Sequence, residues 1–373
     1  MADIRVAGYP YHVEFTRKPS LIEIRDVVNQ SLARFSQAEC EYLRSIGSEL
    51  NPVAEAMHQF ITDSGKRLRP IFSYVGYLGT GATADQSIID ASASLELVHV
   101  CALMHDDVMD GSDTRRGAPA IHRAFEALHK SEKLQGSAEQ YGISAAILLG
   151  DLALIWSAKA LHNSGISAET LIRAQAMYDE MRIELMAGQY LDIHEGALAT
   201  QSVERSLKVA RYKSGKYTIE RPLHFGAALG SATPAELQKI YSAYGLPLGE
   251  AFQLRDDVMG VFGDPQETGK PAGDDIREGK RTVLMAKTFQ KLDQTDSTGA
   301  ATLSKALGNP SLSNDDVERV RSIITDTGAL TELEQLITDL TDQAVAALDA
   351  PVLHSDAREI LTELATVVTR RKS

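Results

Sequence analysis

Helical periodicity runs through almost the whole chain and is the feature that most restricts its fold. Apolar side chains recur every three or four residues. No run alternates apolar and polar residues between turn signals, so strands are not supported. We therefore expect an all-α protein. The predicted helices span residues 21–48, 52–63, 70–79, 84–110, 142–163, 168–194, 202–214, 216–230, 234–262, 281–291, 298–307, 314–327, 329–348 and 355–370.

Polar segments at residues 130–141, 263–280 and 292–299 are expected to form loops. None is long or biased enough to be a domain linker, and the chain has no low-complexity tract or fixed-period repeat. Its 373 residues suffice for one large core or two ordinary domains. We predict a single large helical domain over residues 1–373, with its helices packed around a shared interior.

Composition excludes several classes of partner. The formal net charge of -13 argues against nucleic acid or an anionic membrane surface as the main ligand. Cys40 and Cys101 have no metal-ligand or redox spacing and fit a reducing cytosol. The first residues contain no apolar signal-peptide region, and apolar runs such as residues 144–150 are too short to span a bilayer. We expect a cytoplasmic protein without membrane insertion.

The tetrapeptide DDVM occurs twice beside apolar helical sequence. The first copy lies in LMHDDVMDGSDTRRG at residues 103–117, and the second in QLRDDVMGVFGD at residues 253–264. A buried carboxylate is costly unless it is paired or binds a metal. Asp106 and Asp110 are four residues apart and share one face of a helix, and Asp107 lies three residues before Asp110. These carboxylates can converge on one cation, and oxygen-only ligands favour Mg²⁺ over zinc.

The second copy places Asp256 and Asp257 on another long helix. If the two helices face each other, their carboxylates surround one space, and that much negative charge requires cations. A diphosphate held by several Mg²⁺ ions is the natural occupant of such a space. A single pair of this kind is more often a solvated helix end with salt bridges. Two pairs with basic motifs between them favour the metal interpretation.

Basic motifs accompany both acidic motifs. Lys66 and Arg69 of GKRLRP are three apart and could meet on one helical turn, where they suit a phosphate group. No P-loop and no G-x-S-x-G elbow is present. The cations are more numerous than one diphosphate requires, which suggests two anion sites, one rich in Mg²⁺ and one purely cationic. The further basic candidates are Arg115 and Arg116 of RRG, Lys213 beside Ser214 in KSG, and Lys270 and Lys280 in a Gly-rich segment.

His99 lies seven residues before Asp106, on the same predicted helical face. A lone histidine is more often a satisfied core residue than a ligand. The position of His99 on a stripe that leads to the acidic cluster makes the two interpretations about equal.

Together, the motifs GKRLRP, DDxxD followed by RRG, KSG, FQLRDD and GKPxGDDxxEGK resemble those of the trans-isoprenyl diphosphate synthases of the polyprenyl synthetase family. The resemblance covers about residues 20–370 and is greatest to bacterial geranylgeranyl diphosphate synthases. It implies an isoprenoid synthase fold around a deep central cavity, usually in a homodimer. It also implies condensation of isopentenyl diphosphate with dimethylallyl, geranyl or farnesyl diphosphate, with three Mg²⁺ ions beside the diphosphate.

The resemblance assigns a role to each matching residue. Isopentenyl diphosphate would be held by Lys66, Arg69, His99 and Arg116. The allylic diphosphate would be held by Arg115, Lys213, Ser214, Gln253, Lys270 and Lys280. The metal ligands would be Asp106, Asp110 and Asp256, supported by Asp107 and Asp257. Catalysis would rest on Asp106, Asp110, Lys213 and Asp256.

Two positions depart from the family pattern. Ser214 stands where the family often has threonine, and serine keeps the hydroxyl group. Gly260 occupies the fifth position of the second motif, where the family often has aspartate, so one carboxylate is missing there. Asp264, four residues further on, is the candidate to replace it through water.

The chemistry that the family implies needs no side-chain nucleophile, and none is evident. Mg²⁺ acts as a Lewis acid on the leaving diphosphate, and fixed cations stabilise its developing charge. A terpene cyclase would share this ionisation but would not need Lys66, Arg69 and Arg116. A non-catalytic partner subunit should have lost acidic or basic residues, whereas a helical scaffold with solvated charge would bind no diphosphate.

Product length is expected to depend on the residues just before the first acidic motif. Ala102 is one helical turn before Asp106, with Cys101 beside it. In the family, bulky aromatic residues at these two positions stop chain growth early. Both residues are small here, and the motif lacks the two-residue insertion of the bacterial farnesyl type. Geranylgeranyl diphosphate is therefore favoured, with farnesyl or longer polyprenyl diphosphates as alternatives.

Overall fold

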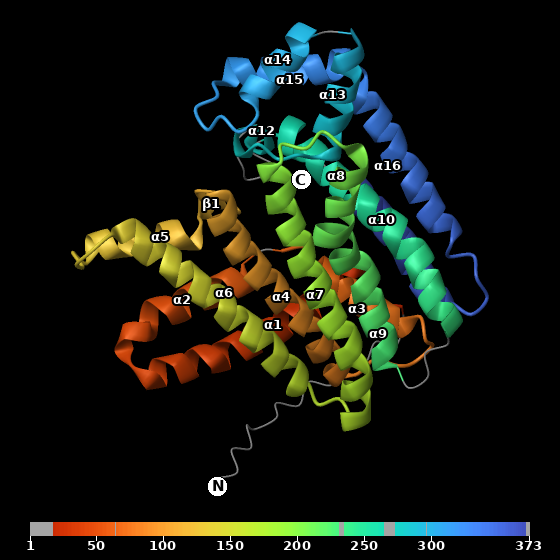
Figure 1. The fold of residues 1–373 in the computed structure, drawn as a ribbon. Helices are drawn as coiled ribbons and strands as arrows, with labels where there is room; N and C mark the ends of the chain where they lie inside the picture. Colours follow the sequence, from red (N-terminus) through yellow and green to blue (C-terminus); the bar gives the residue numbers. More distant parts are fainter. Residues whose placement is uncertain (1–17, 64, 231–234, 265–272, 296, 371–373) are drawn as a thin grey trace.

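The computed structural model describes residues 18–63, 65–230, 235–264, 273–295 and 297–370, and these are almost entirely helical (Figure 1). The all-α prediction is confirmed, apart from one hairpin of two-residue strands, β1 (Thr114–Arg115) and β2 (Ala118–Pro119). The helices are α1 (Leu21–Ile46), η1 (Ser48–Leu50), α2 (Asn51–Thr62), α3 (Leu68–Leu78), α4 (Gln86–Asp110), α5 (Ile121–Ser131), α6 (Ala138–His162), α7 (Ala168–Ala197), α8 (Val203–Val209), η2 (Ala210–Glu220), α9 (Arg221–Leu229), α10 (Ala235–Phe262), α12 (Asp274–Glu278), α13 (Val283–Thr295), α14 (Ser297–Ala306), α15 (Asn314–Asp326), α16 (Ala329–Ala346) and α17 (Ser355–Thr369).

Helix α4 is the central element, and local sequence sets both of its ends. The side chain of Asp85 caps its start by accepting hydrogen bonds from the backbone N–H groups of Ser87 and Ile88. Gly111 ends it in the left-handed conformation, with φ of 66°. Because α4 is apolar around its whole circumference, it is buried among other helices. The first acidic motif is thereby placed in its last turn, at the edge of the core.

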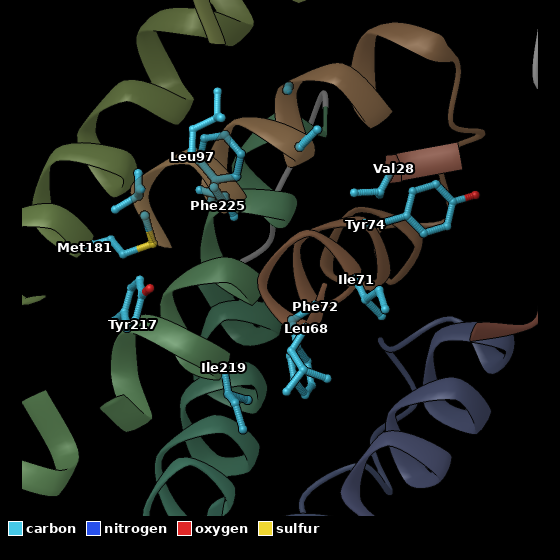
Figure 2. Close-up of a cluster of buried hydrophobic side chains, with 14 of the residues drawn as sticks. Val28, Leu68, Ile71, Phe72, Tyr74, Leu97, Met181, Tyr217, Ile219 and Phe225 are labelled. Atoms are coloured by element: carbon cyan, nitrogen blue, oxygen red, sulfur yellow. The ribbon is translucent and has the colours of Figure 1, made fainter. Parts of the chain in front are cut away.

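The larger hydrophobic cluster surrounds α4 and joins residues of α1, α2, α3, α6, α7, η2, α9, α10 and α17. Figure 2 shows part of it, where Leu68 and Phe72 of α3 lie near Ile219 of η2. Helices α3 and α9 approach very closely, because a Cβ atom at Gly76 or Gly226 would overlap the backbone of the other helix. This contact fixes the start of α3, which carries Arg69.

A second cluster lies in the upper part of Figure 1 and is formed by the C-terminal half of α10 and helices α12 to α16. Helix α10 contributes to both clusters and contains Pro247 in its interior. Two further prolines, Pro70 and Pro222, lie in the first turns of α3 and α9. The second acidic motif is in the last two turns of α10, between the two clusters.

The largest deviation from the predicted elements concerns residues 202–230. Instead of two helices separated at residue 215, α8 continues into an eleven-residue π-helix, η2, and then into α9 without a break. Gly215, where a break was predicted, lies inside this wide helix and packs closely against the backbone of Gly249 of α10, which is consistent with a helix shaped by tertiary packing. It carries Lys213, Ser214 and Tyr217.

Three predicted loops were partly wrong. The segment 130–141 contains only a short connection between α5 and α6, and α5 was missed although Ile121 and Phe125 form a buried face. The segment 292–299 is helical on both sides of residue 296, because α13 extends to Thr295 and α14 starts at Ser297. The segment 263–280 includes the short helix α12, and residues 265–272 lie outside the described part of the chain.

Two helices, α4 and α6, are long and apolar enough by length and composition to cross a membrane, which the sequence analysis did not anticipate. This is weak support for membrane insertion, because the core helix of a globular protein passes the same test. For α4 the apolar window is 72% buried inside the protein, whereas for α6 it is only 39% buried. The exposed face of α6 therefore needs another explanation.

Candidate active site

A cavity of about 530 Å³ lies between α3, α4, α7, η2, α10 and α12, next to the β1–β2 hairpin. It brings together most of the candidate residues from distant parts of the sequence. Three further candidates, Cys101, Asp107 and Asp110, do not line it, and Lys270 lies outside the described residues. The candidates that line the cavity are Lys66, Arg69, His99, Ala102, Asp106, Arg115, Arg116, Lys213, Ser214, Gln253, Asp256, Asp257 and Lys280.

One end of the cavity is cationic and is organised around Tyr217 of η2. The Arg69 guanidinium lies 3.9 Å from the centre of the Tyr217 ring and donates a 2.8 Å hydrogen bond to Thr218 Oγ1. The Tyr217 hydroxyl is 2.8 Å from His99 Nδ1. Burial and the nearby arginines, first among them Arg69 and Arg116, hold the pKa of His99 well below its usual range. The imidazole is therefore neutral at physiological pH.

The cationic end has buried donors that no protein group satisfies. Within the described residues, Arg69 Nε and Arg116 Nη1 are buried and have no hydrogen-bond partner. Burying charged donors without acceptors is costly, so their arrangement suits an anion that enters the cavity. Lys66 lines the same space, but it precedes α3 and does not share a helical turn with Arg69 as the sequence analysis expected.

Arg67, which the sequence analysis did not identify, fixes the segment that carries Lys66 and Arg69. Its backbone is left-handed, with φ of 52°, and its guanidinium is almost fully buried. This guanidinium donates to Asn29 Oδ1 of α1, Glu96 Oε1 of α4 and the Ile61 and Asp63 carbonyls, each at 2.8 Å. Arg67 thus connects three helices behind the cationic end.

The RRG motif is a turn that sends two arginines in different directions. Arg116 and Gly117 both have positive φ, of 52° and 77°, as a two-residue hairpin turn between β1 and β2 requires. Arg115 points to the acidic motif, where its Nε donates a 2.9 Å hydrogen bond to Asp107 Oδ1. The guanidinium of Arg116 instead lies 5.6 Å from the centre of the Phe60 ring, near the cationic end.

The acidic end begins at Asp106, whose carboxylate faces α7 and η2. Its Oδ1 accepts hydrogen bonds from Gln189 Nε2 at 2.9 Å and from Lys213 Nζ at 3.1 Å. Lys213 also pairs with Asp192 Oδ2 at 2.5 Å. Burial alone would raise the pKa of Asp106, but Lys213, followed by Lys280 and Arg115, outweighs it and lowers that pKa. Asp106 is therefore ionised at neutral pH.

Gln189 and Asp192 were missed in the sequence analysis. They lie three residues apart on α7 and both line the cavity. This i, i+3 spacing of polar residues in AGQYLDI was a usable signal. It was less conspicuous than the acidic pairs, because no other charged residue adjoins it.

The other two carboxylates of the first motif have different surroundings. Asp107 is fully buried and pairs with Arg115, so it positions this arginine rather than facing the cavity. Asp110 Oδ2 is 3.6 Å from Lys280 Nζ. Burial and the neighbouring Asp106 raise the pKa of Asp110 to about 6.

The second motif contributes Asp256 and Asp257 from the end of α10. Asp257 is buried and accepts a 2.8 Å hydrogen bond from Gln253 Nε2. Burial, followed by the carboxylates of Asp275 and Asp256, raises its pKa to about 8. Asp264 is exposed and does not line the cavity, so its expected role through water stays a prediction.

The residues present suit a Mg²⁺ ion that is shared with the substrate better than a metal ion whose ligands all come from the protein. Among the described residues, no group of three or more Asp, Glu, His or Cys side chains converges closely enough to hold a metal ion. Lys213 and Lys280 instead pair with the carboxylates. Burial, followed by neighbouring carboxylates, nevertheless raises the pKa values of Asp110 and Asp257, so that a bound cation would favour their ionised forms. Oxygen ligands from few side chains suit a Mg²⁺ ion that shares itself with water and a substrate phosphate.

The two candidate chain-length residues are placed differently. Ala102 lines the cavity one turn before Asp106. Cys101 is fully buried outside it, with its Sγ 3.8 Å from His105 Nδ1, and His105 in turn contacts the Ile147 carbonyl of α6. Adjacent helical residues differ in direction by about 100°, which explains why only one of them faces the cavity.

Comparison with known proteins agrees with this geometry. The chain matches the family model for polyprenyl synthetase over residues 51–324. The geranylfarnesyl diphosphate synthase of Aeropyrum pernix is 33% identical over 317 residues, which cover 83% of this chain and 92% of that protein. The geranylgeranyl diphosphate synthase of Sulfolobus acidocaldarius is 30% identical over 282 residues, covering 75% and 78%.

A solved structure shows the same architecture. The geranylgeranyl pyrophosphate synthase of Corynebacterium glutamicum, complexed with isoprenyl diphosphate and magnesium, superimposes with a TM-score of 0.91 at 41% identity. The match covers 95% of this chain and 100% of that one. The chain therefore belongs to the polyprenyl synthetase family and has its isoprenoid synthase fold, as the motifs predicted.

The metal-free protein should lose stability as pH rises from about 7 to about 8.5. The folded state keeps a proton on Asp257, whose pKa is raised to about 8, whereas the unfolded state has already released it. The stability that this proton contributes is lost as pH passes the folded pKa. Thermal unfolding midpoints in excess chelator would measure the effect, and Asp257→Asn should flatten the decline. The matched control is Asp264→Asn, which should preserve it. A wild-type midpoint that rises over this range would contradict the assignment.

Proposed function

We propose that this protein condenses isopentenyl diphosphate head to tail with allylic diphosphates in a Mg²⁺-dependent reaction, with geranylgeranyl diphosphate as the main product. The observation that carries the proposal is the pairing of two unlike anion sites in one cavity. One end offers unsatisfied arginine donors, and the other offers carboxylates with Lys213 and Lys280. A reaction that joins two diphosphate substrates requires this division.

In this proposal, Lys66, Arg69, His99 and Arg116 hold isopentenyl diphosphate at the cationic end. Their fixed positions orient its double bond towards the acidic end. His99 is neutral and supports this site through Tyr217 rather than by its charge. Arg67 contributes by holding Lys66 and Arg69 in place.

The allylic diphosphate lies at the acidic end. Asp106, Asp110 and Asp256 would hold up to three Mg²⁺ ions, which polarise the leaving diphosphate when bound. Lys213, Arg115 and Lys280 add fixed positive charge where negative charge develops on the leaving group. Asp107 and Asp257 support the site by positioning Arg115 and Gln253. Ser214, Gln253 and, by the resemblance, Lys270 complete the set.

Competing functions account for fewer residues. A terpene cyclase ionises one allylic diphosphate and gives the cationic end no role. A non-catalytic subunit needs neither end intact, whereas every candidate acidic and basic residue that the structure describes is present at or beside the cavity. The condensation accounts for both ends.

We also propose a homodimer formed through α6 and α7. Large apolar side chains are exposed on both helices. An exposed apolar surface of this kind favours an interface. A second copy would also explain why the apolar helix α6 is only partly covered in a protein that we place in the cytoplasm without membrane insertion. The exposed side chains include Ile147, Leu148, Ile155, Ile172, Ile183, Met186 and Tyr190.

We treat residues 1–373 as one catalytic domain. Helix α10 belongs to both hydrophobic clusters, and the cavity is lined by Asp256 of α10 and by Asp275 of α12, a helix that packs in the second cluster. The free cysteines Cys40 and Cys101 are buried, which agrees with the proposed cytoplasmic location.

The direct test of function is turnover of the purified protein. With isopentenyl diphosphate, farnesyl diphosphate and Mg²⁺, mass spectrometry should detect geranylgeranyl diphosphate, and excess chelator should abolish its formation. Asp106→Ala should lower kcat by about a thousandfold, because it removes a ligand of the Mg²⁺ that would stabilise the charge developing on the leaving diphosphate. The exposed Asp326→Ala is the control and should keep normal turnover. Undiminished activity of Asp106→Ala or in chelator would refute the proposal.

A second prediction separates the two anion sites. Arg69→Ala should raise KM for isopentenyl diphosphate about 10- to 100-fold, since one charge-assisted contact contributes about 1.5–3 kcal/mol. Its KM for farnesyl diphosphate should change little. Lys213→Ala is the matched variant and should show the reverse preference. Equal effects of either variant on both substrates would show that the division is wrong.

A third prediction concerns product length. Ala102→Phe should place a ring in the cavity and shift the product from C20 towards C15, as measured by mass spectrometry. Cys101→Phe should leave product length unchanged but lower the unfolding midpoint, because overpacking a full core costs about 1–3 kcal/mol. Two results would place the growing tail elsewhere. One is a shorter product from Cys101→Phe, and the other is an unchanged product length from a folded, active Ala102→Phe.

A further inference from the structure

The last turn of α10 has no side chain at position 260, and another segment fills that space. A Cβ atom on Gly260 would overlap the carboxylate of Asp275. Asp275 belongs to α12, fifteen positions further along the chain, and both residues line the cavity beside Asp256 and Asp257. A carboxylate therefore lies against the backbone of the helical position where the family pattern often has an aspartate.

Asp275 is held firmly in this place. Its carbonyl accepts a 3.0 Å hydrogen bond from the backbone N–H of Lys280, and Gly273 and Gly279 flank α12 in left-handed conformations. The next residue, Ile276, is fully buried in the second hydrophobic cluster, and its carbonyl accepts a 2.9 Å hydrogen bond from Gly308. Burial of Ile276 on one side of the short helix thus directs Asp275 towards α10.

The surroundings of Asp275 connect it to the first acidic motif as well. Lys280 Nζ is 3.4 Å from Asp275 Oδ1 and 3.6 Å from Asp110 Oδ2. One ammonium group therefore bridges the carboxylates of α4 and α12 across the acidic end. Asp274, the neighbouring carboxylate on α12, does not line the cavity.

We propose that Asp275 supplies the carboxylate that α10 lacks at position 260, so that the second half of the acidic site is built from two segments, Asp256 of α10 and Asp275 of α12. The ligand is a divalent cation bound together with a diphosphate. This inference rests on the proposed function, since it assigns a further residue to the same site. It also gives Gly260 a role, because any side chain there would displace Asp275.

Binding of inorganic pyrophosphate at graded Mg²⁺ concentrations, followed by isothermal titration calorimetry, tests the inference without turnover. Asp275→Asn keeps the size of the side chain and removes its charge. It should raise the Mg²⁺ concentration for half-maximal pyrophosphate binding about tenfold, and excess Mg²⁺ should restore binding. Asp274→Asn is the matched control and should resemble the wild type. The double variant Gly260→Asp/Asp275→Gly, which returns the carboxylate to α10, should recover most of the loss.

Two results would overturn the assignment. One is wild-type Mg²⁺ dependence in Asp275→Asn. The other is a loss of pyrophosphate binding that is the same at every Mg²⁺ concentration, which would mean that Asp275 only positions Lys280. Unfolding midpoints identify a variant that does not fold, and Asp275→Asn decides the matter if the double variant is unstable. If the wild type neither turns over nor binds pyrophosphate with Mg²⁺, the proposed function fails instead.

Discussion

Electrostatic repulsion among carboxylates in one cavity is the constraint on which the rest of this structure depends. Asp106, Asp256, Asp257 and Asp275 line a single space, and Asp110 lies at its edge. Lys213 and Lys280 pair with Asp106, Asp110 and Asp275, but burial and carboxylate repulsion still raise the pKa values of Asp110 and Asp257. The site is therefore less stable alone than with cations bound. A protein that binds its metal together with its substrate gains from this arrangement, because neither a tight metal cage nor an empty acidic cavity is favoured.

The scaffold keeps the acidic and cationic ends apart by rigid means. Arg69 and Lys213 belong to opposite ends, yet η2 positions both. Arg69 contacts Tyr217 and Thr218 of η2, and Lys213 is itself a residue of η2. The hairpin turn at Arg116 separates the two arginines of RRG in the same way. Placing both ends on shared elements fixes the distance between the two anion sites, which a condensation needs more than it needs any single contact.

Helical periodicity predicted the fold class, and the family motifs supplied most of the candidate residues that line the cavity. The prediction failed where partners come from separate segments. The supporting role of Asp107 came from the family resemblance, and its pairing with Arg115, away from the cavity, is seen only in the structure. Cys101 and Ala102 are adjacent on α4, and the sequence could not show which of the two faces the cavity. The π-helix and the left-handed Arg67 follow from tertiary packing and leave no local pattern.

The Gly260–Asp275 contact shows why a missing motif residue is a poor guide to a missing function. Gly260 reads as a lost carboxylate when the helix is considered alone, and the nearest acidic residue, Asp264, then appears as its natural replacement. Distance along the chain is misleading here, because α12 folds back onto α10 through Ile276 and carries Asp275 into the space that glycine leaves open. The carboxylate of Asp275 can occupy this space only because residue 260 of α10 has no side chain. The charge of the site is preserved, while its geometry now depends on how α12 packs against the second cluster.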